Sequence, residues 1–337
     1  MEQTRRTALT FALLPFAPRP ASAAPSPALQ EVLDYARGQL TTGFLVVRDR
    51  QVLARANWPL PADAARFRAA FAPGTTAAGE PLEDVASLQK SIVAVLCAIA
   101  ADKGLLDAAR PVSAYLGAGW SKATAAQETR IRVADVLTMT SGLDEAFGYE
   151  APPGEVFFYN TPVYAVTKRL LEAAARRPLE ALTREWLTAP AGMVETAWRP
   201  RPAVFGDVGN PTGLVTTPGD LARLGQFVLD GGRAADGSRI VSEARLAELF
   251  RRTPANPAYG RLWWLNGGDH TVRAPARRVA GPLIPSAPAD LVAALGALDR
   301  KLYVVPSRRL LVVRLGQAAP DRDFDETLWR KLTAALD

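Results

Sequence analysis

A serine and a lysine three residues apart, Ser87 and Lys90, open an apolar run that continues to Ala101. In a helix, residues i and i+3 lie on one face, so this spacing brings the lysine amine beside the serine hydroxyl. Serine is a weak nucleophile until a base takes its proton, and burial and the helix dipole both lower the pKa of a lysine at a helix start. The pair therefore indicates acyl transfer through a covalent serine intermediate. The alternative is an N-cap serine with an exposed lysine one turn later.

The scarcity of other reactive residues narrows the chemistry. The chain has one histidine, His270, and one cysteine, Cys97. A Ser-His-Asp triad would depend on His270, which lies in a Gly-rich segment and is interpreted as a solvated turn residue. A multi-histidine metal site and a disulfide are excluded, and Cys97 is expected to be buried in a helix. We expect no metal and no cofactor.

Composition places the chain among enzyme-sized globular proteins. Of its 337 residues, 48% are hydrophobic and 22% are charged, which is enough to bury a large core. The formal net charge is +6, but the basic residues are scattered rather than gathered in a run. The sequence therefore predicts no nucleic-acid partner.

Residues 1–24 have the organisation of a cleavable export signal. Arg5 and Arg6 precede an apolar stretch at residues 7–16, and the small residues 21–24 resemble a cleavage site. The arginine pair is compatible with twin-arginine export and also with an ordinary secretory signal. No other apolar run reaches the roughly 18 residues that span a bilayer. We expect a mature chain without a membrane span, in the periplasm or outside the cell.

Strand and helix patterns alternate in a way that indicates an α+β fold. Strand patterns occur at residues 43–56, before the serine, and again at residues 259–265, 291–295, 302–305 and 310–315. Helical periodicity dominates from Ser87 to about Pro200 and returns at residues 218–229, 242–250 and 325–336. Strands at both chain ends predict one shared sheet. We assign residues 25–84 and 205–337 to a sheet region and residues 85–204 to a helical region.

A family resemblance extends over nearly the whole mature chain. Ordered sequence blocks are similar to those of class C β-lactamase-like serine hydrolases, a branch of the penicillin-recognising superfamily. These blocks are residues 86–96, 101–107, 111–116, 136–143, 153–159, 191–193, 213–222 and 303–306. The resemblance implies an antiparallel sheet with flanking helices plus a helical region. It also implies that Ser87 is the nucleophile, that Lys90 accepts or relays its proton, and that Tyr159 acts as general base and later as acid.

The second family motif is altered here. The usual Tyr-x-Asn reads Tyr159-Asn160-Thr161, so either Thr161 takes the amide position or the register shifts by one and Tyr159 is not the base. We prefer the first alternative because Pro153-Gly154 then keeps its usual distance to the tyrosine. A tyrosine base also needs cationic neighbours such as Lys90 to lower its pKa from about 10. The structural alternative for Tyr159 is a core aromatic residue.

The third motif, usually Lys-Thr-Gly or His-x-Gly, falls at residues 294–296, where the sequence is Ala-Leu-Gly. Gly296 permits close backbone approach, and the N–H of Ala297 could complete an oxyanion hole with that of Ser87. No cation is present to bind the carboxylate of a penicillin or a D-Ala-D-Ala peptide. This difference favours an uncharged ester or amide substrate, contacted by Asn160, Thr161, Gly296 and Leu298.

Other polar and aromatic residues receive structural interpretations. Asp135, Asp220 and Glu155 are expected to be caps and surface charges. Trp263 and Trp264 alternate across a predicted strand, so one should be in the core and the other could line the acyl pocket.

The hypothesis is an exported serine hydrolase that forms an acyl-enzyme on Ser87 with a small ester or amide. The alternatives are a D-peptidase or β-lactamase that acts on cell-wall material, and a binding protein of the same fold that has lost turnover.

Overall fold

The computed structural model describes residues 24–202, 209–273 and 277–337. Its main element is a six-stranded antiparallel sheet in the order β2-β1-β12-β11-β10-β7. The strands are β1 (Thr41–Arg48), β2 (Gln51–Asn57), β7 (Trp264–Leu265), β10 (Val292–Gly296), β11 (Arg300–Val305) and β12 (Leu310–Gly316). The two ends of the chain share this sheet, as the strand pattern predicted.

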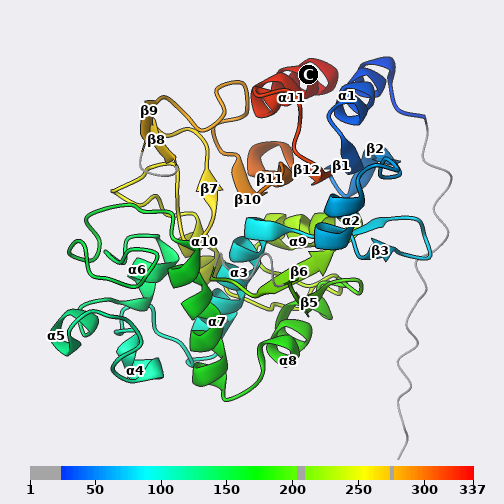
Figure 1. Ribbon diagram of the computed structural model, residues 1–337. Helices are drawn as coiled ribbons and strands as arrows, with labels where there is room; N and C mark the ends of the chain where they lie inside the picture. The colour runs from blue at the N-terminus through cyan, green and yellow to red at the C-terminus, as the bar shows by residue number, and fades with distance from the viewer. Residues whose placement is uncertain (1–23, 203–208, 274–276) are drawn as a thin grey trace, which may run out of the picture.

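The central strands are apolar on both faces because both faces are covered. On β11, Leu302 and Val304 join the larger core, whereas Tyr303 and Val305 join a second core on the opposite face. The larger core includes helices α3 and α9, and the second includes α1 and α11. Figure 1 shows α1 and α11 side by side near the two chain ends, with α3 and α9 across the sheet.

The helices begin at polar caps that the sequence supplies. Asn160 caps α7 by accepting from the N–H of Val163, and Thr217 and Ser242 cap α9 and α10 in the same way. The helices are α1 (Pro27–Gly38), α2 (Ala65–Phe71), α3 (Gln89–Asp102), α4 (Ser113–Leu116), α5 (Ala125–Glu128), α6 (Val133–Leu137), α7 (Thr161–Ala175), α8 (Leu179–Thr183), α9 (Pro218–Leu229), α10 (Glu243–Leu249) and α11 (Phe324–Leu336).

A smaller sheet in the order β3-β4-β6-β5 was not predicted from the sequence. It consists of β3 (Gly74–Thr75), β4 (Pro81–Asp84), β6 (Thr212–Thr216) and β5 (Ala197–Pro200). The last of these strands comes from residues that the sequence analysis assigned to the helical region. These strands are short and lack a clear alternation, so they had no signal in the sequence. The sheet matters because β4 leads directly into the segment that carries Ser87.

Two details differ from the predicted strands. Residues 259–265 were expected to form one strand, but only Trp264–Leu265 is a strand. Leu262 has a φ of 57°, and the N–H of Gly260 bonds to the carbonyl of Trp263, so the chain turns back there. A hairpin of β8 (His270–Arg273) and β9 (Arg277–Ala280) was not predicted.

The expected signal peptide, apart from Ala24, lies outside the described residues, as does the expected region boundary at residue 204. Within the described ranges, no helix is both long enough and apolar enough to cross a membrane.

Candidate active site

Ser87 lies in a single 3₁₀ turn, Ala86–Leu88, between β4 and α3. Ala86 adopts a left-handed conformation with a φ of 49°, which costs a non-glycine residue on the order of 1–3 kcal/mol. Its N–H donates to Asp84 Oδ1 at 2.8 Å, and its carbonyl accepts from Gln89 Nε2 at 3.0 Å. Asp84 itself accepts hydrogen bonds from Arg201 Nε and Nη2, at 2.7 and 2.9 Å. The turn is therefore fixed on both sides of the residue that precedes the serine.

Lys90 points back toward Ser87 from the first turn of α3, as the i, i+3 spacing requires. Its Nζ lies 2.9 Å from Ser87 Oγ and 3.2 Å from Thr161 Oγ1. Two aromatic rings complete its surroundings, with Nζ 4.9 Å from the ring centroid of Tyr159 and 4.7 Å from that of Tyr164. Lys90 is 2% exposed, so the expectation of an exposed lysine beside an N-cap serine is wrong.

The surroundings of Lys90 favour its neutral form. Burial is the main cause that holds the pKa of Lys90 well below its ordinary value of 10.5, and the positive charges of Arg201 and Lys168 lower it further. Within the described part of the chain, no carboxylate is among its hydrogen-bond partners. A neutral amine at hydrogen-bond distance from a hydroxyl can accept that hydroxyl's proton.

Lys168 is a second buried cation that the sequence analysis did not single out. Its Nζ lies 2.7 Å from Asn210 Oδ1, 2.8 Å from the carbonyl of Thr212 and 5.8 Å from the Tyr164 ring. Burial lowers the pKa of Lys168 to about 7. The Tyr164 ring thus contacts Lys90 and Lys168, which are far apart in the chain. A contact between one aromatic ring and two lysines that are distant in the chain leaves no local sequence pattern, so the sequence analysis could not predict it.

Tyr159, in the segment before α7, lies beside Ser87 and Lys90. Burial raises the pKa of Tyr159 to about 12, although a hydrogen bond with Ser87 acts in the opposite direction. The Trp264 ring stacks on the Tyr159 ring at a centroid distance of 5.9 Å, and Tyr259 packs edge-on against it at 6.3 Å. Tyr159 is therefore beside Ser87 as expected, but its pKa is not lowered as a tyrosinate base would need.

The geometry separates the roles of Thr161 and Asn160. Thr161 Oγ1 faces Lys90, whereas Asn160 is buried and bonds elsewhere. Asn160 Nδ2 donates to the carbonyls of Leu143 and Asp144, both at 2.9 Å, and its Oδ1 caps α7. Asn160 therefore anchors the loop that connects α6 to α7, and Thr161 occupies the position that faces the lysine.

Gly296, at the end of β10, lies directly against the nucleophile turn. A β-carbon on Gly296 would be 2.3 Å from the carbonyl oxygen of Val85 and 3.2 Å from the nitrogen of Leu88. Only glycine permits this approach. Residues 297–299 form the connection to β11, and Ala297 is exposed. The strand end that resembles the third motif thus adjoins the turn that carries Ser87.

The other polar residues considered in the sequence analysis make contacts away from Ser87 and Lys90. His270 begins β8 and contacts Asp269 and Arg278, at 2.8 and 3.3 Å, and its side chain is 13% exposed rather than solvated. Asp135 accepts from the N–H of Arg132 near the start of α6, as expected of a cap. Glu155 is exposed.

Asp220 is not a surface charge. It is 0% exposed and accepts from the backbone N–H of Glu195 and the hydroxyl of Thr196. It ties the chain after α8 to the first turn of α9.

The two neighbouring tryptophans differ in burial as the alternation predicted, although only Trp264 lies in a strand. Trp263 is fully buried in the core, and Trp264 is half-buried beside Tyr159. In the parts of the chain that the structure describes, no three His, Cys, Asp or Glu side chains gather as a metal site would need.

Comparison with known proteins identifies the family. The Beta-lactamase family model matches residues 29–336, nearly the whole described chain. The chain belongs to this family.

Solved structures with the same fold agree with that assignment. A family VIII carboxylesterase has a TM-score of 0.66 at 15% identity, covering 93% of this chain and 98% of its own. A β-lactamase from Mycobacterium bovis has a TM-score of 0.62 at 18% identity, covering 92% and 97%. EstCE1, a hydrolase with promiscuous acyltransferase activity, has a TM-score of 0.62 at 16% identity, covering 92% and 96%. No curated protein matches this sequence. Family membership supports a serine hydrolase in general, and these neighbours show the fold.

Proposed function

We propose that this protein hydrolyses small uncharged esters or amides through an acyl-enzyme on Ser87. The observation that carries the proposal is the buried Lys90 amine, 2.9 Å from Ser87 Oγ, with no carboxylate among its hydrogen-bond partners in the described residues. Burial and the charges of Arg201 and Lys168 lower its pKa, so the amine can act as the base. Family membership supports the same chemistry.

In the first step Ser87 Oγ attacks the carbonyl carbon while its proton moves to Lys90 Nζ. The negative charge that develops on the carbonyl oxygen is stabilised by the backbone N–H groups of Ser87 and Ala297. The bond from the carbon to the leaving group then breaks, and the leaving group takes a proton from the Lys90 ammonium through Tyr159. An acyl ester on Ser87 remains.

Water completes the cycle by the reverse sequence of proton movements. It attacks the acyl carbon as its proton moves to Lys90, and the Ser87 oxygen leaves and recovers a proton from the same group. Because the pKa of Tyr159 is about 12, its phenol keeps its proton near neutral pH and serves as a donor and relay rather than as the initial base.

The substrate class follows from what lines the site. The aromatic rings of Tyr159 and Trp264 stack beside Ser87, and the positions that resemble the third motif are Ala294, Leu295 and Gly296, none of them charged. A substrate carboxylate would find no cation at these three positions. The solved carboxylesterase with this fold supports the preference for esters.

Turnover of p-nitrophenyl acetate and butyrate, with nitrocefin in parallel, tests the proposal with the mature protein and Ser87→Ala. We expect ester release that is lost in Ser87→Ala and little cleavage of nitrocefin. Rapid nitrocefin cleavage would instead support a β-lactamase. Absence of any Ser87-dependent turnover would support a binding protein.

Export through residues 1–24 is part of the proposal, because the basic, apolar and small-residue segments follow the order of a signal peptide. N-terminal sequencing of the protein secreted by an expressing cell tests it. A mature chain that begins near Pro25 is expected, and a chain that retains Met1 would contradict it.

A further inference from the structure

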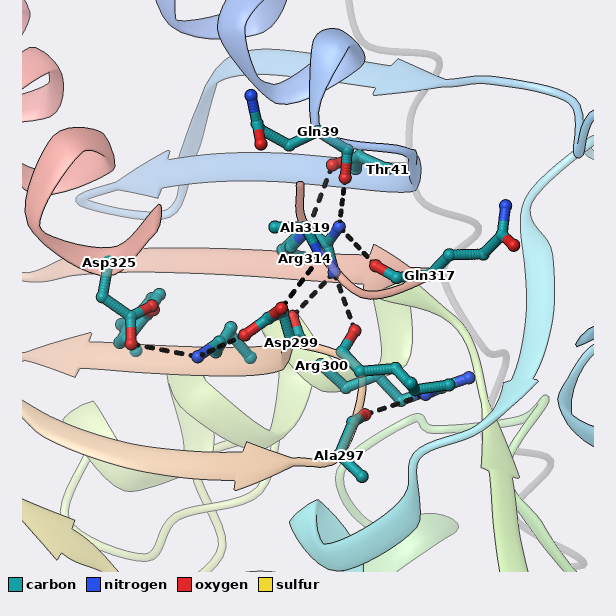
Figure 2. Close-up of polar contacts among 12 residues, drawn as sticks. Gln39, Thr41, Ala297, Asp299, Arg300, Arg314, Gln317, Ala319 and Asp325 are labelled. Carbon is teal, nitrogen blue, oxygen red and sulfur yellow. Dashed lines mark hydrogen bonds and ion pairs between the residues drawn. The ribbon is translucent and has the colours of Figure 1, made fainter. Parts of the chain in front are cut away.

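The connection between β10 and β11 is held from inside the protein by two buried arginines. Three consecutive carbonyls accept hydrogen bonds there. Arg300 Nη1 donates to Ala297 O at 2.9 Å, and Arg314 Nη1 donates to Leu298 O at 3.0 Å and Asp299 O at 2.9 Å. Figure 2 shows both guanidinium groups beside this connection. Both side chains are 0% exposed.

The backbone of this connection is not one that its own sequence favours. Leu298 and Asp299 have φ values of 60° and 59°, so two successive non-glycine residues are left-handed. Turns with two left-handed residues favour Asn-Gly, and leucine is a poor residue for this conformation. The conformation therefore depends on contacts from elsewhere in the structure.

Arg314 links the connection to the rest of the main sheet. Its Nε donates to Thr41 Oγ1 at 3.1 Å, and its Nη2 donates to the carbonyls of Gln39 and Gln317 at 2.6 and 2.7 Å. These groups lie at the start of β1 and the end of β12. One side chain therefore fixes the position of the connection relative to two strands.

Arg300 is fixed by different contacts. Its guanidinium lies 4.5 Å from the ring centroid of Phe71 and 5.2 Å from that of Phe67, both on α2. Glu83 on β4 lies 3.4 Å from its Nη2. Among the described residues, Nε and Nη2 have no hydrogen-bond partner, so its one hydrogen bond, from Nη1, is to Ala297. Burying a cation costs desolvation free energy, so stability alone is a weak explanation for an arginine at this position.

We propose that Arg300 and Arg314 are positioning residues. By holding the three carbonyls of residues 297–299, they fix the turn that follows the Gly296–Ala297 peptide, so that the N–H of Ala297 faces the oxyanion formed at Ser87. The inference rests on the proposed function. Gly296 places the Gly296–Ala297 peptide against Val85 and Leu88, and the two arginines hold the carbonyls directly after it, where the two turns meet. An oxyanion donor is effective only when its direction is fixed before the reaction.

A double-mutant cycle with Leu298→Asn tests the proposal. Asparagine adopts the left-handed conformation readily, and this change keeps the Asp299 contacts with Lys301 and the N–H of Ala319. We expect Arg300→Met to lower kcat for p-nitrophenyl butyrate about tenfold to a hundredfold with KM within about twofold. In the Leu298→Asn background the same change should cost about threefold or less, because the turn then holds itself.

Tyr303→Phe is the matched control, since Tyr303 is a buried residue of β11 that bonds to Asp325 on the opposite face of the sheet. It should lower Tm without changing kcat. Equal losses of kcat for Arg300→Met in both backgrounds would overturn the proposal, because loss of the positive charge alone is not rescued by a turn residue. Arg314→Lys should lower kcat with little change in KM, as expected for Arg300→Met.

Hydrogen exchange separates failure of this proposal from failure of the proposed function. The amides of residues 297–299 should exchange faster in Arg300→Met than in wild type and be unchanged in Tyr303→Phe. If the wild-type protein shows no Ser87-dependent turnover, the proposed function fails, while exchange still reports on the turn. Unchanged exchange at residues 297–299 would overturn the positioning role in either case.

Discussion

Two turns meet at the candidate active site, and they are held in different ways. The nucleophile turn has left-handed Ala86, fixed by Asp84 and Gln89, which are two and three residues away. The connection from β10 to β11 has left-handed Leu298 and Asp299, whose carbonyls accept from Arg314, fifteen or more residues away. Side chains close in the sequence contact the first turn directly, whereas the second is held by the distant Arg314 as well as by the nearby Arg300.

The difference shows how the fold divides the chemistry. The nucleophile turn brings together Ser87 and Lys90, whose i, i+3 relation is set at the start of one helix. The second turn contributes a backbone N–H and close approach at Gly296, which depend on sheet register and on buried cations. Variants of the first turn should therefore change proton transfer, whereas variants of the second should affect catalysis through oxyanion binding and leave proton transfer unchanged.

The largest effect is expected from Asp84→Asn, which releases the nucleophile turn and leaves the buried Arg201 without its partner. Breaking a buried pair by changing one member costs about 3–5 kcal/mol. We expect that loss in urea unfolding and about a hundredfold decrease in kcat/KM, because the Ser87 segment is no longer fixed. Asp230→Asn, which removes the ion pairs of Asp230 with the more exposed Arg50 and Arg309, is the control and should cost about 1 kcal/mol or less. Equal losses for the two variants would contradict the special role of Asp84.

Gly296→Ala tests the contact between the two turns. The added β-carbon would lie 2.3 Å from the Val85 carbonyl, so the turns must separate. We expect a loss of about 1–3 kcal/mol in stability and a lower kcat. Gly38→Ala is the control, since nothing lies within 4 Å of a β-carbon there. A Gly296→Ala variant with wild-type kcat would show that close approach of the turns is not needed.

The pH profile of Lys168→Met should distinguish proton transfer at the nucleophile turn from oxyanion binding at the second turn. Removing a positive neighbour favours protonated Lys90 and raises its pKa, so the acid limb of kcat/KM should move to higher pH. Lys168 itself loses its proton near pH 7, so the effect should appear below that pH and vanish above about pH 8. Arg300→Met should lower kcat without moving the profile. A Lys168→Met profile with an unshifted acid limb would show that Lys168 does not influence the base.

The smallest effect is expected from Ala86→Gly, which relieves the left-handed strain. Glycine carries little penalty at positive φ, so Tm should rise by an amount that corresponds to about 1 kcal/mol or less. Activity should stay within about twofold, because Asp84 and Gln89 continue to hold both adjacent peptides. A large loss of kcat would mean that the alanine side chain itself is needed.

The sequence predicted the main sheet because its strands are long, strongly apolar and joined by short turns. Residues 302–305 and 310–315 match β11 and β12 closely, and residues 218–229 match α9. The small sheet and the β8–β9 hairpin were missed because their strands have two to five residues. The β4–β6 pairing in the small sheet also joins segments distant in the chain, which propensity alone does not indicate.

The candidate site likewise contains residues that the sequence predicted and residues that it did not. Ser87 and Lys90 were predictable because one helical turn relates them. Thr161 was the preferred residue for the second-motif amide position because Pro153-Gly154 then keeps the distance to Tyr159 that the family resemblance implies. Lys168, Arg201, Arg300 and Arg314 were not, because each acts through contacts that exist only after the chain folds. The raised pKa of Tyr159 also comes from packing, which no local pattern records.

Covalent labelling with a fluorophosphonate, followed by mass-spectrometric mapping of the modified peptide, tests the central claim most directly. The reagent phosphonylates a serine that has an adjacent base and an oxyanion hole. We expect one adduct, on Ser87, that is absent from Ser87→Ala and much slower to form in Lys90→Met. Labelling of another residue, or equal labelling of wild type and Ser87→Ala, would contradict the claim that Ser87 and Lys90 carry the chemistry.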